Sequence, residues 1–333
     1  MASFMALTSR IFVAGQRGLV GSAIVRALQR AGYNNLLLPS HQELDLTDAA
    51  ETRRFFDTER PDYVFLAAAK VGGILANKSY PAEFIFQNLS IQTNVIDSAY
   101  QFGTKRLLFL GSSCIYPRLA PQPLKEEYLL AGPLESTNRP YAVAKIAGIE
   151  MCWAYNRQYG TQYLAVMPTN LYGPGDNYDL ENSHVIPAMI RKMHEAKING
   201  ANELILWGTG EPRREFLYSD DMAEACVALT NLEESAFASL TGHSTEPPVV
   251  NIGCGEDMSI RELAERIAQI VGFRGVISFD ASKPDGTPRK LLEISKIRAI
   301  GWTPRFELAA GLQLAYDAFL QEYVGLSRAA ECV

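Results

Sequence analysis

The chain has 333 residues, of which 47% are hydrophobic and 20% charged, and its formal net charge is −6. This composition is typical of a globular protein with enough apolar residues for one large or two closely packed domains. The acidic balance, with no basic run interleaved with aromatic residues, argues against nucleic acid as a partner, and no apolar run is long enough to span a membrane.

The cysteines indicate neither a disulfide framework nor a metal site. They are odd in number, scattered, and without a Cys-x-x-Cys pair: Cys114, Cys152, Cys226, Cys254 and Cys332. Residues Met1 to Arg10 lack the apolar core of a signal peptide. These features predict a cytoplasmic protein with no metal ligands.

Short apolar runs alternate with helical segments through the first half of the chain. Strands are predicted at Ile11–Ala14, Leu36–Leu38, Tyr63–Leu66, Arg106–Leu110 and Tyr163–Met167, and helices at Ser22–Arg30, Glu51–Arg60, Phe84–Gln101 and Tyr141–Gly160. Short continuous apolar strands that alternate with helices are typical of a parallel sheet covered on both faces. The predicted fold class is therefore α/β, with a Rossmann-type doubly wound parallel sheet.

The pattern changes after Thr169, where a Gly- and Pro-rich loop at 172–178 leads into a new region. Helices are predicted at Val185–Lys197 and Ser259–Val271, and strands at Leu204–Trp207 and Val249–Gly253, the last of which returns to the first sheet. We expect a cofactor domain over 8–171 with a returning segment near 216–253. A smaller, discontinuous C-terminal α/β substrate domain covers 172–215 and 254–325, and 1–7 and 326–333 form flexible termini.

A glycine loop follows the first strand and opens the first helix. Gly15 permits the tight turn, Gly18 lets the backbone approach a pyrophosphate, and Gly21 allows close helix packing. The same spacing also occurs in plain βα turns. Its placement favours a dinucleotide site.

The end of the second strand decides which dinucleotide fits. An acid there would hold the ribose 2′-hydroxyl of NAD, but Leu38 is followed by Pro39, Ser40 and His41, and Glu43 comes later. Arg17, inside the glycine loop, can pair with a 2′-phosphate unless it is only a solvated cation. The sequence favours NADP(H).

Ser112, Tyr141 and Lys145 form a carbonyl-reducing set. Tyr141 and Lys145 lie four residues apart on one helix face, where the ammonium is expected to lower the tyrosine pKa. The Ser112 hydroxyl would hold the substrate carbonyl oxygen, and Tyr141 would donate the proton. The alternative is an unrelated Tyr–Lys pair on a helix surface.

Cys114 has no task in hydride transfer, and its chemistry leaves two interpretations open. A lone cysteine at a strand end is usually a small buried hydrophobe. At a ligand-binding edge a thiol can also move a proton at a carbon next to a ketone, with His184 as the opposing acid.

The second half also supplies cations and a flat aromatic side chain for an anionic substrate that carries a ring. They are Arg191, Lys192, Arg213, Arg214, Arg289, Lys290 and Trp207. Most surface cations are merely solvated; the pair Arg213 and Arg214 is the strongest candidate among them.

With these residues placed, the chain from about Ile11 to Leu320 resembles the GDP-L-fucose synthase family, a branch of the extended short-chain dehydrogenase/reductases. The cysteine-bearing block combined with the Asn-Ser-His block is the most specific part of the resemblance. The matching blocks are Leu66–Gly73, Gly111–Pro117, Tyr141–Gly148, Met167–Pro174, Asn182–Pro187 and Lys283–Lys290.

The resemblance implies NADPH-dependent conversion of GDP-4-keto-6-deoxy-D-mannose to GDP-L-fucose, by 3,5-epimerisation and then 4-keto reduction. Cys114 would be the base and His184 the acid of the epimerisation, with Tyr141, Lys145 and Ser112 reducing the ketone. The implied cofactor contacts are Gly15, Gln16, Arg17, Gly18, Leu19, Val20, Gly21, His41, Ala67, Ala68, Ala69, Lys145, Pro168, Thr169, Asn170, Leu171 and His184. The implied substrate contacts are Lys192, Trp207, Arg214 and Asp285.

The resemblance also implies a homodimer, joined through the helices at 84–101 and 141–160, with Ile91, Val95, Ile149 and Trp153 as candidate contacts. Gln16 and Lys192 depart from the family, which usually has His and Arg there; neither belongs to the catalytic set.

Two rival functions remain. A redox-neutral epimerase or dehydratase often has Asp-Glu just after the serine, where this chain has Ser113, Cys114 and Ile115. A catalytically silent nucleotide-binding protein would have no need of the whole catalytic set.

Overall fold

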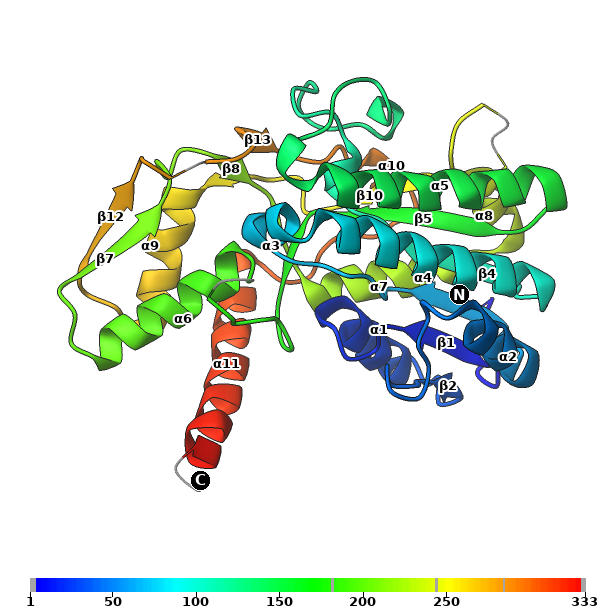
Figure 1. Cartoon of the computed structure of the whole chain (residues 1–333), viewed down its shortest axis with the longest axis horizontal. Coiled ribbons are helices and arrows are strands. Elements are labelled where there is room, and N and C mark those ends of the chain that lie inside the picture. Colours follow the sequence, from blue (N-terminus) through cyan, green and yellow to red (C-terminus); the bar gives the residue numbers. More distant parts are fainter. Residues whose placement is uncertain (1–3, 181–182, 243–244, 284, 331–333) are drawn as a thin grey trace.

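A six-stranded parallel sheet forms the centre of the larger part of the molecule (Figure 1). The computed structural model describes residues 4–180, 183–242, 245–283 and 285–330. The strand order is β10-β5-β4-β3-β1-β2, which confirms the predicted Rossmann-type fold. The strands are β1 (Ile11–Ala14), β2 (Leu36–Leu37), β3 (Tyr63–Leu66), β4 (Arg106–Leu110), β5 (Tyr163–Pro168) and β10 (Val249–Ile252).

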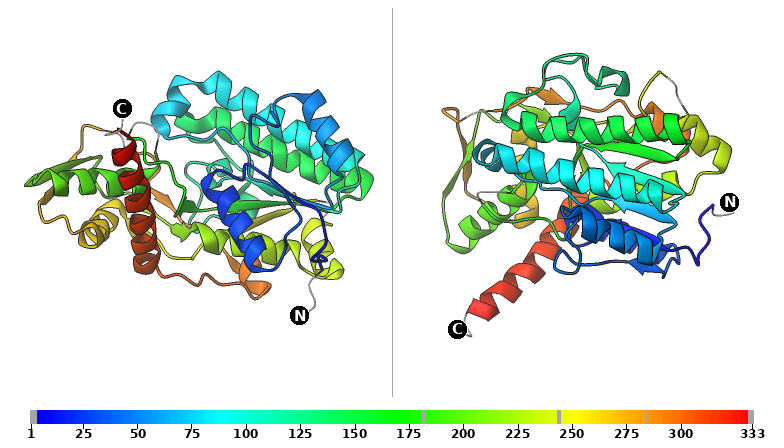
Figure 2. Two further views of the ribbon diagram at one scale, coloured as in Figure 1. Left: turned by 90° about the horizontal axis from the view of Figure 1, so that it is seen from below. Right: turned by 45° about the vertical axis from the view of Figure 1, so that its right-hand side comes forward.

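Helices cover both faces of this sheet, as Figures 1 and 2 show. On one face α4 packs against both α2 and α5, and on the other α1 packs against α7. Helix α1 begins three residues earlier than predicted, directly after Gly18. The helices are α1 (Leu19–Arg30), α2 (Ala49–Glu59), α3 (Ile74–Ser79), α4 (Pro81–Gln101), α5 (Arg139–Tyr159), α7 (Ser219–Thr230), α8 (Glu234–Thr241) and α10 (Ser295–Ala299).

A second unit lies beside the sheet, on the left in Figure 1, and has its own hydrophobic cluster. It contains short sheets rather than one large sheet, with β7 paired to β12, and β8 between β11 and β13. Its strands are β7 (Glu203–Trp207), β8 (Arg213–Arg214), β11 (Met258–Ser259), β12 (Val276–Asp280) and β13 (Arg289–Lys290), and its helices are α6 (Val185–Ile198), α9 (Ile260–Val271) and α11 (Leu308–Ala330). The pair β6 (Asn170–Tyr172) and β9 (Phe216–Tyr218) joins it to the larger unit.

The predicted return to the first sheet is confirmed, because β10 pairs with β5 in parallel. The two hydrophobic clusters support the predicted division, whose boundaries stay a prediction. Residues 1–3 and 331–333 of the predicted flexible termini lie outside the described residues, as do Asn182 and Pro284 of the family blocks. Within the described part, Met5 is fully buried and the α11 backbone is helical to Ala330. No described helix is both long and apolar enough to cross a membrane.

Glu215, between β8 and β9, joins the two units. Its side chain is fully buried and accepts the backbone N–H groups of Gly255 at 2.7 Å and Leu292 at 3.0 Å. Its own carbonyl accepts the side chains of Thr169 at 3.0 Å and Asn170 at 2.9 Å. One residue therefore connects the end of β5 with the segments that follow β10 and β13.

We expect Glu215→Ala to destabilise the protein, because it leaves the buried Leu292 N–H and the half-buried Gly255 N–H without acceptors. Each such group costs about 1–3 kcal/mol, so the free energy of unfolding should fall by about 3 kcal/mol. Chemical denaturation measures this difference. The matched control is Glu256→Ala at an exposed site nearby, which should change the value by less than about 0.5 kcal/mol. Equal values for both variants would contradict the assigned role.

Candidate active site

A cleft of about 1660 Å³ is lined by the carboxyl ends of the parallel strands and by the second unit. Ligands bind at this edge in open α/β sheets, next to the point where the strand order reverses, which here lies between β1 and β3. The volume exceeds that of a typical small-molecule pocket, so the cleft has room for two ligands. The cofactor, catalytic and substrate contacts implied by the family resemblance all line it, whereas three of the candidate cations, Arg191, Arg213 and Arg289, do not.

The glycine loop has the shape that a pyrophosphate needs. Gly15 has a φ of +82°, and a Cβ there would lie 2.7 Å from the backbone nitrogen of Ala68. A Cβ on Gly21 would lie 2.0 Å from the Gly15 carbonyl oxygen. At Gly18 the nearest such contact is 3.5 Å away, which leaves its backbone open at the N-terminus of α1. These residues fit a dinucleotide.

At the end of the cleft beside β2, no acid stands directly after the strand where NAD would need one. Arg17 and His41 line the cleft, whereas Glu43 is not among its lining residues. The Glu43 carboxylate instead accepts the backbone N–H of Ser40 at 2.7 Å, a bond that lowers its pKa. Glu43 is therefore occupied in a turn, and Asp45, which does line the cleft, accepts the Thr47 backbone N–H at 2.9 Å and the Thr47 hydroxyl at 2.7 Å.

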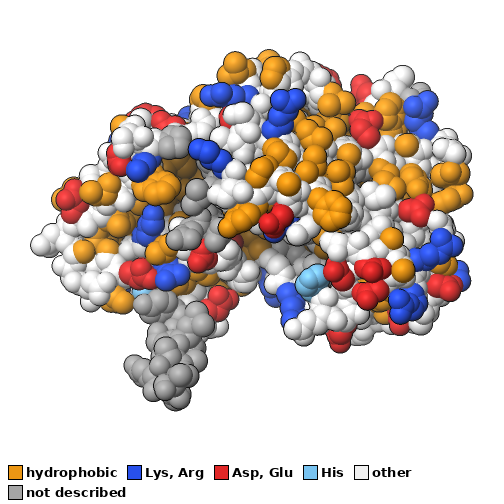
Figure 3. Space-filling view, viewed as in Figure 1, with side chains coloured by type: hydrophobic (Ala, Val, Ile, Leu, Met, Phe, Trp, Pro, Cys, Tyr) orange, Lys and Arg blue, Asp and Glu red, His pale blue; other side chains and the backbone are white. Residues whose placement is uncertain are grey.

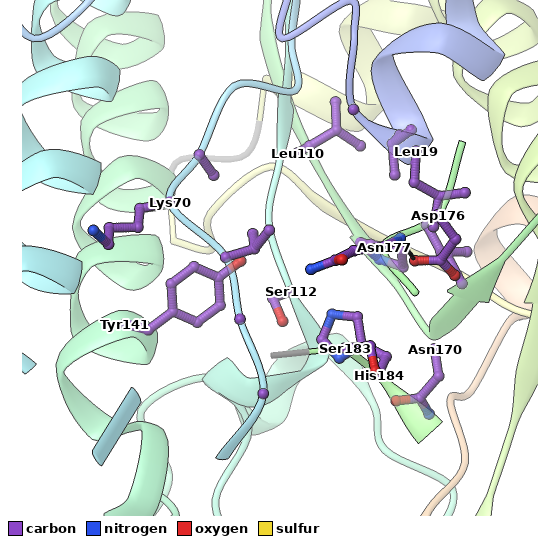
Figure 4. A pocket seen from close by; sticks show the side chains of 18 of the residues that line it. Leu19, Lys70, Leu110, Ser112, Tyr141, Asn170, Asp176, Asn177, Ser183 and His184 are labelled. Atoms are coloured by element: carbon purple, nitrogen blue, oxygen red, sulfur yellow. Dashed lines mark hydrogen bonds between the residues drawn. The ribbon is translucent and has the colours of Figure 1, made fainter. Parts of the chain in front are cut away.

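Ser112, Tyr141 and Lys145 converge at the centre of the cleft. Figure 4 shows the Tyr141 ring pointing from α5 toward Ser112, while the Lys70 side chain points away. The Phe84 ring of α4 packs edge-on against Tyr141, with 6.3 Å between ring centroids. Lys145 is only 2% exposed and its Nζ donates to the Leu110 carbonyl at 2.7 Å. This bond places the ammonium at the end of β4, beside the tyrosine.

The expected lowering of the tyrosine pKa is wrong. Burial raises the pKa of Tyr141 above its usual value, and the nearby Cys114 raises it further, while the Ser112 hydroxyl opposes the shift. The Lys145 Nζ lies 5.8 Å from the Tyr141 ring centroid, and burial lowers its own pKa to about 8. Desolvation outweighs attraction here, so Tyr141 is a protonated donor at neutral pH.

Cys114 follows Ser112 in a short helical turn, where its backbone N–H donates to the Ser112 Oγ at 3.4 Å. The residue is 5% exposed, and burial raises the pKa of its thiol, an effect opposed chiefly by Lys290. His184 is exposed to the cleft at the start of α6, and it lies beyond Ser112 from Tyr141 in Figure 4. The cleft walls lower its pKa by desolvation. The structure thus brings the thiol and the imidazole to one cleft.

The cations separate into two groups. Lys192, Arg214 and Lys290 line the cleft together with Trp207, and the Lys192 Nζ lies 5.7 Å from the Trp207 ring centroid. Arg191 instead pairs with Glu195 at 2.7 Å, and Arg213 with Asp257 at 2.9 Å. Arg289 also pairs with Asp257. Of the pair favoured from sequence, only Arg214 faces the cleft.

Asp285 also lines the cleft, but both of its carboxylate oxygens are engaged. They accept the Thr209 backbone N–H at 2.7 Å and the Thr209 hydroxyl at 2.8 Å. This bridge holds the turn after β7 next to Trp207. Sequence reasoning gave no particular weight to Lys290, or to Ser183 and Asn177, which also line the cleft. Because β13 has only two residues, the sequence holds no alternation of side chains that would have marked Lys290.

Known proteins resemble this chain in sequence and in fold. The model of the NAD dependent epimerase/dehydratase family matches residues 11–253. GDP-L-fucose synthase 1 of Arabidopsis thaliana is 57% identical over 94% of each chain, and GDP-L-fucose synthase of Escherichia coli K12 is 52% identical over 94% of this chain and 97% of its own. A crystal structure of a GDP-L-fucose synthetase from Naegleria fowleri bound to NADP is 27% identical, covers 96% of both chains and has a TM-score of 0.84. The chain belongs to the NAD dependent epimerase/dehydratase family, and within it to the group of the GDP-L-fucose synthases.

Proposed function

We propose that this protein converts GDP-4-keto-6-deoxy-D-mannose to GDP-L-fucose with NADPH. The observation that carries the proposal is that two proton-handling sets line one cleft: Tyr141 with Ser112, and Cys114 with His184. A reductase alone needs only the first set. Relatives that are 52–57% identical bear the name of this activity, and an NADP-bound structure shares the fold.

The two inversions depend on the acidity of the hydrogens beside the ketone. Cys114 takes a proton from carbon 3 or 5, and the C–H electron pair moves to the ketone oxygen as an enolate. Ser112 and Tyr141 donate hydrogen bonds to that oxygen and stabilise its charge. His184 returns a proton to the opposite face of the carbon, which inverts its configuration.

Reduction uses the same ketone oxygen. NADPH, when bound along the glycine loop, supplies the hydride. Tyr141 transfers its phenolic proton to the oxygen, and the Lys145 ammonium, held by the Leu110 carbonyl, stabilises the negative charge left on Tyr141. Because one ketone serves both steps, one cleft suffices for both.

The cations that line the cleft are suited to bind the nucleotide part of the substrate. Arg214 and Lys192 would bind the diphosphate, and the exposed face of Trp207 would stack on the base. Asp285 would act mainly by holding the turn that carries this wall, since its oxygens already accept two bonds from Thr209.

We further propose a cytoplasmic homodimer. The location rests on the scattered cysteines, and the dimer on an apolar groove between α4 and α5, lined by Pro81, Ala82, Ile85, Arg139, Pro140 and Val143. Figure 3 shows hydrophobic side chains gathered over this face, where Phe86 is 67% exposed.

Of the four contacts expected from sequence, Val95 and Ile149 are wrong because both are fully buried within the protomer, and Ile91 lines the cleft. Among them only Trp153 stays a candidate.

The function is tested by incubating the protein with GDP-4-keto-6-deoxymannose and NADPH in deuterated water. We expect GDP-fucose with deuterium at carbons 3 and 5, detected by NMR and mass spectrometry. Cys114→Ser should release a reduced sugar with neither inversion nor deuterium, because it lacks the base. Cys254→Ser, outside the cleft, should behave as the parent protein. Loss of both activities in Cys114→Ser would contradict the assignment, and a redox-neutral product from the parent would favour the rival epimerase or dehydratase.

Tyr141→Phe should have the opposite effect: it should lose reduction and keep the exchange of protons at carbons 3 and 5. Without the phenolic proton, NADPH oxidation should slow by about 10²-fold or more. Deuterium should still enter carbons 3 and 5, because Ser112 still holds the ketone oxygen. Tyr159→Phe, on the same helix but outside the cleft, is the control. Unimpaired reduction in Tyr141→Phe would remove Tyr141 from its assigned role.

Sedimentation equilibrium should give twice the chain mass of 36.8 kDa. Phe86→Glu should yield monomers, because it places a charge on the apolar face of α4. Leu119→Glu, at another exposed apolar site, should leave the dimer intact. A parent protein that sediments only as a monomer would disprove the dimer.

A further inference from the structure

Cys114 can act as a base only as a thiolate, and its surroundings work against that form. The side chain is 5% exposed, and burial favours the neutral thiol. Lys145, one of the two nearby ammonium groups, already donates to the Leu110 carbonyl. A second positive charge is therefore needed at the sulfur.

We propose, on the basis of the proposed function, that Lys290 is the positioning residue whose ammonium pairs with Cys114 and holds it as the thiolate base of the epimerisation. This step goes beyond binding the substrate anion, because it assigns Lys290 to the sulfur.

The strand geometry turns Lys290 into the cleft. β13 runs parallel to β8, with Arg289 opposite Arg213 and Lys290 opposite Arg214. Successive side chains of a strand point to opposite faces. Asp257, whose side chain is 5% exposed, pairs with both Arg213 and Arg289 and holds them on the outer face. Arg214 and Lys290 consequently face the cleft, and both line it.

Backbone bonds connect the Lys290 segment to the loop that follows Cys114. The Leu124 N–H donates to the Leu291 carbonyl at 2.7 Å, and the Glu293 N–H donates to the Leu124 carbonyl at 2.8 Å. The Leu291 N–H also donates to the Gln122 side chain at 2.9 Å. Because these bonds begin at the residue after Lys290, they hold the end of β13 against the loop that follows Cys114.

The charges around Lys290 leave the thiolate as its natural partner. Within the described residues no carboxylate forms an ion pair with Lys290. Glu135 faces it but pairs with Arg118 at 3.2 Å, and Arg214 repels it. Burial lowers the pKa of Lys290, and Cys114 opposes that shift. The other groups that face Cys114 are Lys145, Tyr141 and Ser112, of which only Lys145 is cationic.

The proton balance needs no additional reagent. In the resting cleft, moving the Cys114 proton through solvent to neutral His184 produces a thiolate and an imidazolium without changing the total number of protons. The thiolate takes the substrate proton and becomes a thiol, and the C–H electron pair moves to the ketone oxygen. The imidazolium gives its proton to the opposite face, which returns both groups to their starting forms. Lys290 remains an ammonium throughout.

The test measures the ionisation of Cys114 in the folded protein. Thiolate absorbance is recorded against pH, as the difference between each protein and its Cys114→Ser counterpart, which isolates this one thiol. Lys290→Gln and, as a second neutral variant, Lys290→Met should raise the midpoint by about one pH unit or more. Deuterium entry at carbons 3 and 5 should slow by about tenfold or more at neutral pH. Lys290→Arg should keep the parent midpoint.

The matched control is Arg289→Gln, which removes a cation one residue away on the outer face and should leave the midpoint unchanged. An unchanged midpoint in both neutral Lys290 variants would disprove the pairing, even if their affinity for GDP fell. An equal shift in Arg289→Gln would also disprove it, because the effect would then come from the strand and not from Lys290. A shifted midpoint in a protein that exchanges no substrate proton would contradict the proposed function while supporting the pairing.

Discussion

The buried carboxylate of Glu215 is the constraint on which the cleft depends. It is fully buried, and its two oxygens accept N–H groups from Gly255 and Leu292, while its carbonyl accepts Thr169 and Asn170. A buried carboxylate is tolerated only when its oxygens are well bonded, so its partners cannot move apart without a large cost. The segment after β5 and the segments that follow β10 and β13 are thereby held in one geometry.

This constraint also positions two cations, Arg214 and Lys290, at the active site. Arg214 precedes Glu215 directly, and Lys290 lies two residues before Leu292, which donates to the carboxylate. Both cations project from adjacent short strands, while Asp257 holds their outer neighbours. The second unit therefore places two positive charges near Cys114, at the carboxyl edge of the large sheet. There they would stabilise both the anionic groups of the substrate and a Cys114 thiolate.

Burial also determines which of the site residues are protonated. Tyr141 has its pKa raised and stays a donor, whereas Lys145, with a pKa of about 8, still carries its charge near neutral pH. Cys114 and His184 are shifted toward their neutral forms. Reduction can start from this resting state, but epimerisation needs one proton moved from sulfur to imidazole. The same desolvated cleft that suits hydride transfer makes a cation at the thiol necessary.

The sequence predicted the parts whose signals are local. Continuous apolar runs located β1, β3 and β4 residue for residue, and the glycine spacing located the loop after β1. Two-residue strands such as β8 and β13 have no periodicity to detect, so the direction of Arg214 and Lys290 was invisible. The prediction of a lowered Tyr141 pKa was wrong because burial of the phenol has the larger effect. That burial depends on packing from other elements, such as Phe84 of α4, which the spacing of Tyr141 and Lys145 does not reveal. Val95 and Ile149 were misassigned because apolar helix positions look alike whether they face the sheet or a partner subunit.

The central claim is that inversion and reduction act on one ketone in one cleft. A crystal structure of the protein with NADP⁺ and GDP-L-fucose bound tests it most directly. The account predicts the sugar ring between Cys114 and His184, with Tyr141 and Ser112 on the oxygen at carbon 4 and the nicotinamide facing that carbon. A sugar whose carbons 3 and 5 lie away from Cys114, or with both side chains on the same face of the ring, would contradict it.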